Sequence, residues 1–338
     1  MKRIGFLFDR AFSKESLYQA WLDASRHKMG KRSTYLFSKR LAFNLDALHQ
    51  ELHSGTYRPR PYARFEVYEP KQRVIYGPSF RDLVVQHAIY RLIYPIFNPT
   101  LIDQSFACRN GKGTHAAADY AQKAMRKSPV WSYILKLDIR KFFYRIDRDR
   151  LRIMLERRIK DRRFLDVMMI FAEYGHPKIE PIGIPIGNLL SQLYALVYLN
   201  PLDQFIKRSL KARWYARYVD DFVIFGWARW RCLAALASIQ SFLASRLGLE
   251  LSKFTLSPVG RGLNFVGYRT WRSRRFIRRH SLHKASKAAK RGKLDSLIAI
   301  LGHARNTASW RYLLNLTKGK HHAIFNRLPK SHRCGLYA

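Results

Sequence analysis

The sequence combines a strong positive charge with enough apolar residues to form a core. Its 338 residues include 63 Lys and Arg against 23 Asp and Glu, a net charge of +40, while 47% are apolar and 14% aromatic. This content excludes a disordered basic tail. The charge argues against a small-metabolite enzyme without a polyanionic partner, because like charges destabilise a compact chain. We expect nucleic acid as the partner, with an anionic membrane surface as the alternative.

The N-terminal third predicts helices around one hairpin. Helical spacing covers 13–53 and is interrupted by KMGKRS. Apolar and polar residues alternate over 62–76, which predicts a hairpin with basic residues near its tip. A second helix is expected over 80–97, followed by a Gly-containing loop that leads into an Ala-rich helix near Thr114.

The centre of the chain alternates between strands and helices without a regular β-α-β order. That order favours an α+β sheet over a doubly wound parallel sheet. The length fits roughly two domains of about 150 residues. The expected elements are a strand at 131–139, helices at 151–159, 164–174 and 190–210, two strands within 213–226, a helix at 229–247, and strands within 249–258 and 262–271.

The composition changes after Trp271. Residues 272–338 hold 17 Lys and Arg but one acid, Asp295, and a helical pattern covers 283–301 after a basic, strand-like SRRFIRRH. We place a domain boundary near 271–282. Charge runs are often solvated faces, but so large an excess favours contact with phosphates.

Two further features bound the location of the protein. The uncharged stretch 181–202 is long enough to span a bilayer, but its Gly, Pro, Asn and Gln residues predict a loop that runs into a buried helix. Cys108, Cys232 and Cys334 form no C-x-x-C pair, which argues against disulfides and structural zinc. We expect a cytoplasmic protein without a membrane anchor.

Three acids stand out in this basic chain. Asp138 ends the strand WSYILKLD, and Asp220 and Asp221 form the tip of a hairpin between two apolar strands. Adjacent acids are also ordinary turn residues, so a solvated hairpin is the alternative. The apolar surroundings, the second acid site and the charge favour a site for Mg²⁺ shared with substrate phosphates. A pair of such ions activates a 3′-hydroxyl and stabilises leaving pyrophosphate.

Six motifs follow one another along the chain: EPKQRVIYGPSFRDLVVQHAI (69–89), FACRNGKGTHAA (106–117), KLDIRKFFYRID (136–147), GIPIGNLLSQLYALVYLNPLD (183–203), YVDD (218–221) and NFVGY (264–268). This ordered set, over about 57–270, resembles the reverse transcriptases. The resemblance implies a right-hand polymerase fold with fingers, a palm whose antiparallel sheet carries the YVDD hairpin, and a helical basic thumb. It also implies an RNA-directed DNA polymerase, with a helical extension at 1–56, fingers and palm at 57–271, and a thumb at 272–338.

One motif narrows the resemblance to a branch. Most reverse transcriptases carry Q-G-x-x-x-S-P at the dNTP pocket, whereas this chain has Ile186 at the Gln position and ends the motif with Ser191-Gln192. This is similar to the enzymes of diversity-generating retroelements, which copy a template-repeat RNA with errors at adenines so that the cDNA replaces a variable repeat. Leu190 departs from the Thr frequent there. The alternatives are a group II intron- or retron-like reverse transcriptase and a non-catalytic RNA-binding protein, which the three intact acids disfavour.

The resemblance also assigns roles at the reaction centre. It implies that Asp138, Asp220 and Asp221, with the Ile139 carbonyl, hold two Mg²⁺ ions, for which Mn²⁺ is a possible substitute. At the dNTP, Arg73 grips the triphosphate with help from Lys71, and Ile186 and Gly187 line the nascent base pair. Phe143 matches the steric gate against a ribose, although Phe142 is adjacent and only one of them can face the pocket. Lys253 falls either near the leaving pyrophosphate or in solvent.

The implied partners are nucleic acids and one protein. We expect template RNA, a primer, dNTPs and an oligomer of a small basic accessory variability protein. The candidate nucleic-acid contacts are Arg109, Gln192, Arg272, Arg274, Arg275, Arg278, Arg279, Lys284, Lys287 and Lys290.

Overall fold

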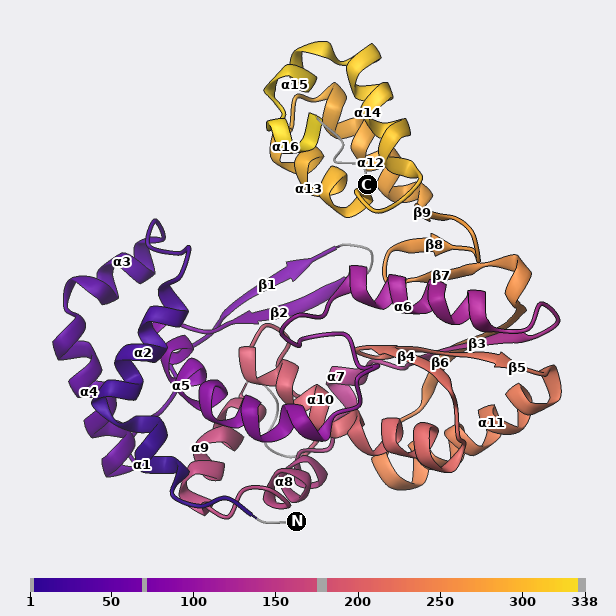
Figure 1. The fold of residues 1–338 in the computed structure, drawn as a ribbon. Coiled ribbons are helices and arrows are strands. Elements are labelled where there is room, and N and C mark those ends of the chain that lie inside the picture. The colour runs from indigo at the N-terminus through magenta and orange to yellow at the C-terminus, as the bar shows by residue number, and fades with distance from the viewer. Residues whose placement is uncertain (1–2, 69–71, 175–180, 334–338) are drawn as a thin grey trace. The chain divides into compact units, whose positions relative to one another are not determined.

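The computed structural model describes residues 3–68, 72–174 and 181–333, which form two compact units interleaved along the sequence (Figure 1). The first unit comprises Met1–Asp103, Ile139–Ser209 and Ser238–Ser252, and the second comprises Gln104–Asp138, Leu210–Ala237 and Lys253–Ala338. Each unit is therefore assembled from three separate segments. The division at 1–56, 57–271 and 272–338 stays a prediction.

Helices make up most of the first unit, and their ends follow local sequence signals. Ser13 caps one helix by accepting the Ser16 amide proton at 3.1 Å, and Gly55 ends another with a left-handed φ of 76°. The helices are α1 (Leu7–Phe12), α2 (Lys14–Ser25), α3 (Arg32–Lys39), α4 (Leu41–Ser54), α5 (Phe80–Phe97), α7 (Phe142–Arg145), α8 (Arg148–Glu156), α9 (Arg162–Glu173) and α10 (Leu189–Gln204), which a π-helical turn, Phe205–Ser209, extends.

The first unit also contains the predicted hairpin. β1 (Ala63–Val67) and β2 (Arg73–Gly77) pair antiparallel, with Val67 opposite Arg73 next to the tip. The expected loop before a buried helix is present as well, since α10 begins only at Leu189 and is mostly buried. Among the described helices, none is both long and apolar enough to cross a membrane.

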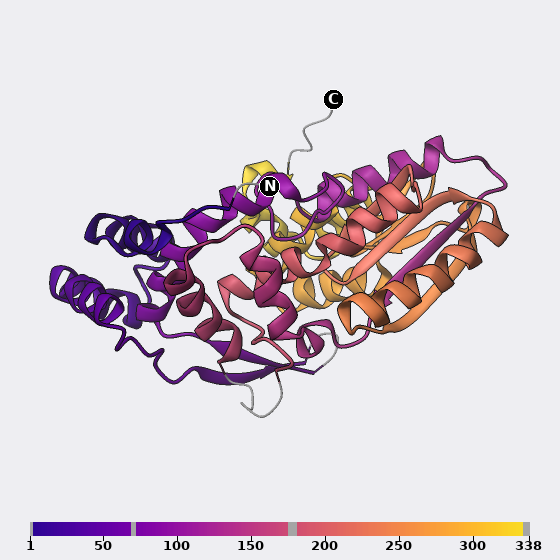
Figure 2. The same cartoon turned by 90° about the horizontal axis from the view of Figure 1, so that it is seen from below.

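The second unit is built on a four-stranded sheet in the order β4-β5-β3-β6. β5 pairs antiparallel with both β3 and β4. α6 (Thr114–Lys127) lies along one face of this sheet (Figure 1, Figure 2), where its small Ala side chains pack on Ile134, Val223 and Phe225. The strands are β3 (Tyr133–Ile139), β4 (Trp214–Tyr218), β5 (Asp221–Trp227) and β6 (Leu251–Pro258), and α11 (Arg229–Phe242) with a π-helical turn, Leu243–Leu247, follows β5.

The C-terminal part of the second unit adds a small sheet and a helical bundle. The predicted helix over 283–301 is divided at Gly292, whose left-handed φ of 65° ends the helical path. Tyr268 joins this part to α6, because its hydroxyl lies 3.0 Å from Nδ1 of both His115 and His303. The elements are β7 (Leu263–Phe265), β8 (Tyr268–Thr270), β9 (Arg275–Ile277), α12 (Arg279–Lys290), α13 (Leu294–Ala304), α14 (Ser309–Lys320), α15 (His322–Arg327) and α16 (Lys330–Arg333).

Candidate active site

Strand register places the three candidate acids at one end of the central strands of the four-stranded sheet. Asp138, near the end of β3, lies directly opposite Asp221, the first residue of β5. Tyr218 pairs with Asp221 in the β4–β5 hairpin, so Val219 and Asp220 form its two-residue turn. The hairpin predicted from YVDD is thus present, and Asp138 faces Asp221, which lies 83 positions later in the sequence.

The turn holds a strained residue and a buried arginine. Val219 has a left-handed φ of 57°, which is unfavourable for a β-branched residue by about 1–3 kcal/mol. The side chain of Arg217 is buried, and its Nη1 donates to the Val219 carbonyl at 3.0 Å. Arg217 therefore braces the turn that carries Asp220. The single Arg within the apolar strand WYARY was the sequence signal for this role.

Burial and like charge perturb the carboxyl group of Asp221. Burial raises its pKa to about 6, Lys136 opposes that rise, and the nearby Asp138 and Asp220 add to it. Its Oδ2 lies 2.8 Å from Lys136 Nζ, whereas its Oδ1 is buried without a hydrogen-bond partner. An unpartnered buried carboxylate oxygen is an unfavourable arrangement that a bound cation would relieve.

The donor set suits a hard divalent cation. Carboxylate oxygens are the ligands that Mg²⁺ prefers. The Oδ1 atom of Asp221, which accepts no hydrogen bond, could coordinate such an ion. Within the described ranges, however, no three His, Cys, Asp or Glu side chains are gathered closely enough to hold a metal ion. The oxygen donors thus suit Mg²⁺, but they are not gathered into a complete site. The assignment of two ions to Asp138, Ile139, Asp220 and Asp221 stays a prediction.

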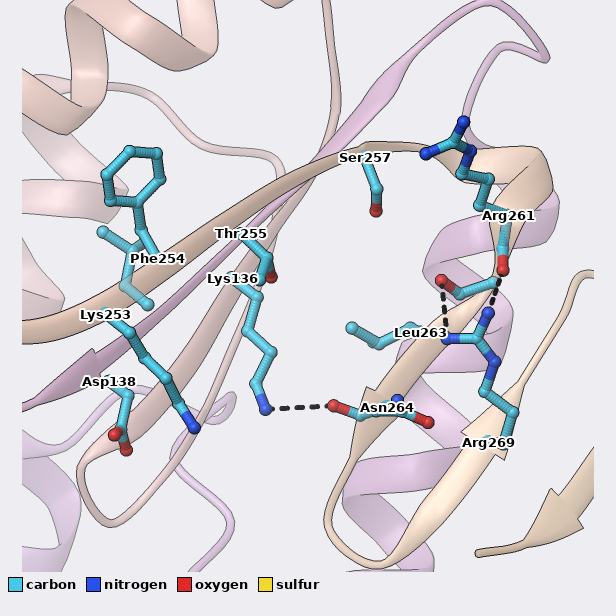
Figure 3. Close-up of a pocket in the computed structure, with 12 residues that line it drawn as sticks. Lys136, Asp138, Lys253, Phe254, Thr255, Ser257, Arg261, Leu263, Asn264 and Arg269 are labelled. Atoms are coloured by element: carbon cyan, nitrogen blue, oxygen red, sulfur yellow. Dashed lines mark hydrogen bonds between the residues drawn. The ribbon is translucent and has the colours of Figure 1, made fainter. Parts of the chain in front are cut away.

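A cationic pocket opens beside Asp138 (Figure 3). It has a volume of about 370 Å³, and the side chains of Lys136 and Lys253 extend into it from β3 and β6. Lys136 also donates to the Asn264 carbonyl at 3.0 Å. Lys253, the predicted pyrophosphate contact, and Asp138, a predicted metal ligand, thus line the same pocket. It is lined by Lys136, Leu137, Asp138, Lys253, Phe254, Thr255, Ser257, Arg261, Gly262, Leu263, Asn264 and Arg269.

The first unit contains most of the residues assigned to the dNTP. Phe142 is buried while Phe143 is partly exposed, so of the two neighbours Phe143 is the one free to meet a ligand. The Phe143 carbonyl accepts from the Ile184 amide at 2.9 Å, and the Ile186 carbonyl accepts from Tyr76 on β2 at 2.8 Å. Arg73 is exposed at the start of that strand. Lys71 lies outside the described residues.

A comparison with protein families decides the identity of the fold. Residues 69–270, more than half of the chain, match the model described as "Reverse transcriptase (RNA-dependent DNA polymerase)". The chain belongs to the reverse transcriptase family. This region is its RNA-dependent DNA polymerase domain, and it contains the three acids, the pocket lysines and the loop at Ile186.

Individual members of the family share only low sequence identity with this chain. Protein YkfC of Escherichia coli is 25% identical over 286 residues, which cover 71% of this reverse transcriptase and 74% of YkfC. The group II intron-encoded protein LtrA of Lactococcus lactis is 27% identical over 165 residues, covering 46% of this chain and 27% of LtrA. Among solved structures, telomerase from Candida albicans aligns with a TM-score of 0.49 at 13% identity, covering 80% of this chain and 55% of that chain.

Two buried polar residues of the reverse transcriptase position the Ile186 loop and were not predicted. Gln86 and Asn188 are both buried and lie 3.3 Å apart between Nε2 and Oδ1. Gln86 Oε1 accepts from the Leu189 amide at 2.9 Å, and Asn188 Nδ2 donates to the Phe171 carbonyl at 3.2 Å. They hold the start of α10. Nothing in a single sequence indicates a pairing over this separation.

The predicted nucleic-acid contacts fall into different surroundings. Arg275 departs from the set, because it is buried and its Nη2 pairs with Asp119 at 2.5 Å and Gln122 at 3.0 Å, which gives it a structural role. Arg272 donates to the carbonyls of Ser128 and Arg126. Arg109 and Lys284 are half-buried. The exposed members are Gln192, Arg274, Arg278, Arg279, Lys287 and Lys290.

The raised pKa of Asp221 predicts a pH-dependent stability difference. Because folding raises this pKa from 3.8 to about 6, the folded chain binds the proton more tightly, and that stabilisation is lost as the pH rises through about 6. In EDTA, Asp221→Asn should therefore gain roughly 2 kcal/mol relative to wild type between about pH 4 and pH 7. Denaturant unfolding of both proteins at both pH values measures this, and an equal difference at the two pH values would contradict it.

Proposed function

We propose that this chain is an error-prone reverse transcriptase of a diversity-generating retroelement, in which Asp138, Asp220 and Asp221 hold two divalent ions. The observation that carries the catalytic assignment is the register that sets Asp138 opposite Asp221 beside the Asp220 turn. When bound, the cations would supply charge neutralisation at the reacting phosphate. Mg²⁺ is the expected ion, and Mn²⁺ is a possible substitute.

The remaining residues would bind and orient the substrates. Arg73 offers a planar pair of donors to the triphosphate, and Phe143 offers a ring that would collide with a ribose 2′-hydroxyl. Lys253, in the pocket beside Asp138, would stabilise the charge of the leaving pyrophosphate. The antiparallel sheet with the Asp220 hairpin corresponds to the palm, and the basic bundle from α12 onward to the thumb. Its exposed cations would bind backbone phosphates without reading sequence.

Template RNA, a primer and dNTPs are the proposed partners, together with an oligomer of a small basic accessory protein in the cytoplasm. Primer extension tests the polymerase. The purified chain, given an RNA template, a DNA primer, dNTPs and Mg²⁺, should produce cDNA, and chelation should stop it. An absence of product with every primer and template, with and without neighbouring gene products, would contradict the proposal.

The proposed branch depends on Ile186, which stands where most reverse transcriptases have Gln. The side chain of Ile cannot donate or accept a hydrogen bond at the nascent base pair, so the geometry of base pairing would be enforced less strictly. We expect Ile186→Gln to lower the frequency of errors at template adenines by about tenfold, which is the worth of one hydrogen bond of roughly 1.4 kcal/mol. Sequencing of cDNA from both proteins on one RNA measures it.

Equal adenine error frequencies in the two proteins would remove the proposed role of Ile186. Low and evenly distributed errors in the wild-type cDNA would favour the second candidate, a group II intron-like enzyme. That candidate is supported by the 27% identity to LtrA over 165 residues.

A further inference from the structure

A lysine contacts Asp221 at the place where two acids face each other. Asp138 and Asp221 are directly opposed across β3 and β5, an arrangement that is destabilising for like charges. Lys136 lies two residues before Asp138 on the same face of β3, and its partner in the register is Val223. Asp221 is therefore its diagonal neighbour, within reach of a long side chain. Its Nζ lies 2.8 Å from Asp221 Oδ2.

The ammonium of Lys136 has a second, independent anchor. It donates to the Asn264 carbonyl on β7 at 3.0 Å, and Figure 3 shows the side chain extended across the pocket toward that strand. Its side chain is only 18% exposed. An ammonium has three donors, so it bonds the carboxylate and the carbonyl together. Release of the carboxylate would leave it bonded to Asn264 rather than stranded.

The other charges around the pair differ in their contacts. Asp138 and Asp220 add negative charge near Asp221, and Lys253 lines the pocket beside Asp138. Arg269, also in the pocket, donates to the backbone carbonyls of Gly262 and Arg261. Lys136 is thus the pocket cation whose contact with Asp221 the structure records.

We propose that Lys136 is a positioning residue that acts as a built-in counter-cation, holding Asp221 through Oδ2 until a divalent ion binds the same carboxylate and then releasing it. The inference rests on the proposed metal role of Asp221. Before the ion binds, the lysine neutralises the opposed acids and holds the Asp221 side chain in one orientation. Since the two oxygens of a carboxylate share a single negative charge, the lysine and the divalent ion compete for it, and the lysine weakens ion binding while it stabilises the metal-free fold.

Two measurements that move in opposite directions test the proposal. Lys136→Met should lower the thermal midpoint in EDTA by about 3 °C, the effect of an ion pair worth about 1 kcal/mol in a chain of this size. The same variant should bind Mn²⁺ about threefold more tightly, because the competing cation is gone. Electron paramagnetic resonance of free Mn²⁺, titrated into the full chain, gives the affinity without any activity measurement.

Matched variants separate the effect of the Lys136–Asp221 ion pair from the effect of positive charge in general. Lys136→Arg keeps the cation and should keep the wild-type midpoint. Lys253→Met removes one positive charge from the same pocket without that contact, and should change Mn²⁺ affinity less than Lys136→Met does. Unchanged or weaker Mn²⁺ binding by Lys136→Met, or an equal gain in Lys253→Met, overturns the proposal.

The proposed function fails in a distinguishable way. If Asp220→Asn and Asp221→Asn bind Mn²⁺ with the wild-type affinity, the metal site lies elsewhere. Both the proposed metal role of these acids and the proposed competition by Lys136 are then wrong. If those variants abolish binding while Lys136→Met behaves like wild type, only the competition is wrong.

Discussion

Replacing Asp220 with Asn should reduce primer extension on an RNA template by about a thousandfold, the loss expected when one preorganised charge is removed from a transition state. Asp220 occupies the second position of the two-residue β4–β5 turn, directly before Asp221, which pairs with Tyr218. Asn is accepted at turns as readily as Asp, so the exchange removes the charge and leaves the hairpin. The thermal midpoint should stay within about 2 °C of wild type, as for a change worth less than 0.5 kcal/mol.

The comparison needs a control with the same change of charge. Asp149→Asn provides it, because Asp149 is exposed in the first turn of α8 and lies outside the candidate site. Single-turnover extension by wild type, Asp220→Asn and Asp149→Asn, each at saturating Mg²⁺ and dNTP, separates chemistry from binding. Extension by Asp220→Asn at the wild-type rate would show that polymerisation does not use this carboxylate.

The sequence predicted the parts of the site that short segments determine. Asp138 ends a strand of apolar residues, and Asp220 and Asp221 follow another, so local patterning placed all three near strand ends. Their mutual approach still depended on the β3–β5 register, which sets Asp138 opposite Asp221 rather than one residue away. The family resemblance implied that the three acids act together, but not this register, because composition and periodicity carry no register between distant strands.

The residues that support the site were harder to predict. Lys136 follows the alternation of β3 and shares a face with Asp138, so a signal existed, but its contact needs the diagonal neighbour on β5. Arg275 shows the opposite error: it lies in a basic run that predicts solvent or phosphate contact, yet its side chain is buried and bonds to Asp119 and Gln122 on α6. A run of basic residues is a property of the local sequence, whereas the burial of one side chain depends on the residues that the fold packs against it.

Phe142 and Phe143 illustrate the same limit at neighbouring positions. Both are aromatic, and their spacing from Asp138 differs by one residue, so the sequence left the choice open. The short helix α7 turns Phe142 into the core and leaves Phe143 partly exposed. Rotation of about 100° between successive helical residues decides this, and it follows from where α7 begins.

Gly187→Ala should destabilise the first unit by about 3 kcal/mol, because two unfavourable effects coincide at this position. The backbone of Gly187 has a φ of 117°, which L residues rarely adopt. A Cβ added there would lie 2.5 Å from the Tyr76 carbonyl oxygen and 2.9 Å from Ile75 Cγ2. Neither backbone nor a β-branched side chain can withdraw easily, so either β2 or the Ile186 loop must move.

Gly55→Ala separates the two effects within the same unit. Gly55 also has a left-handed φ, 76°, but a Cβ there would meet nothing within 4 Å, so only backbone strain of about 1 kcal/mol is expected. Denaturant unfolding of both variants should therefore differ by about 2 kcal/mol. Gly187→Ala should also raise the KM for dNTP, since the displaced strand begins at Arg73, whereas Gly55→Ala should not. Equal destabilisation in the two variants would mean that the loop yields without strain, and that the close contact with β2 does not hold in place the residues proposed to bind the nucleotide.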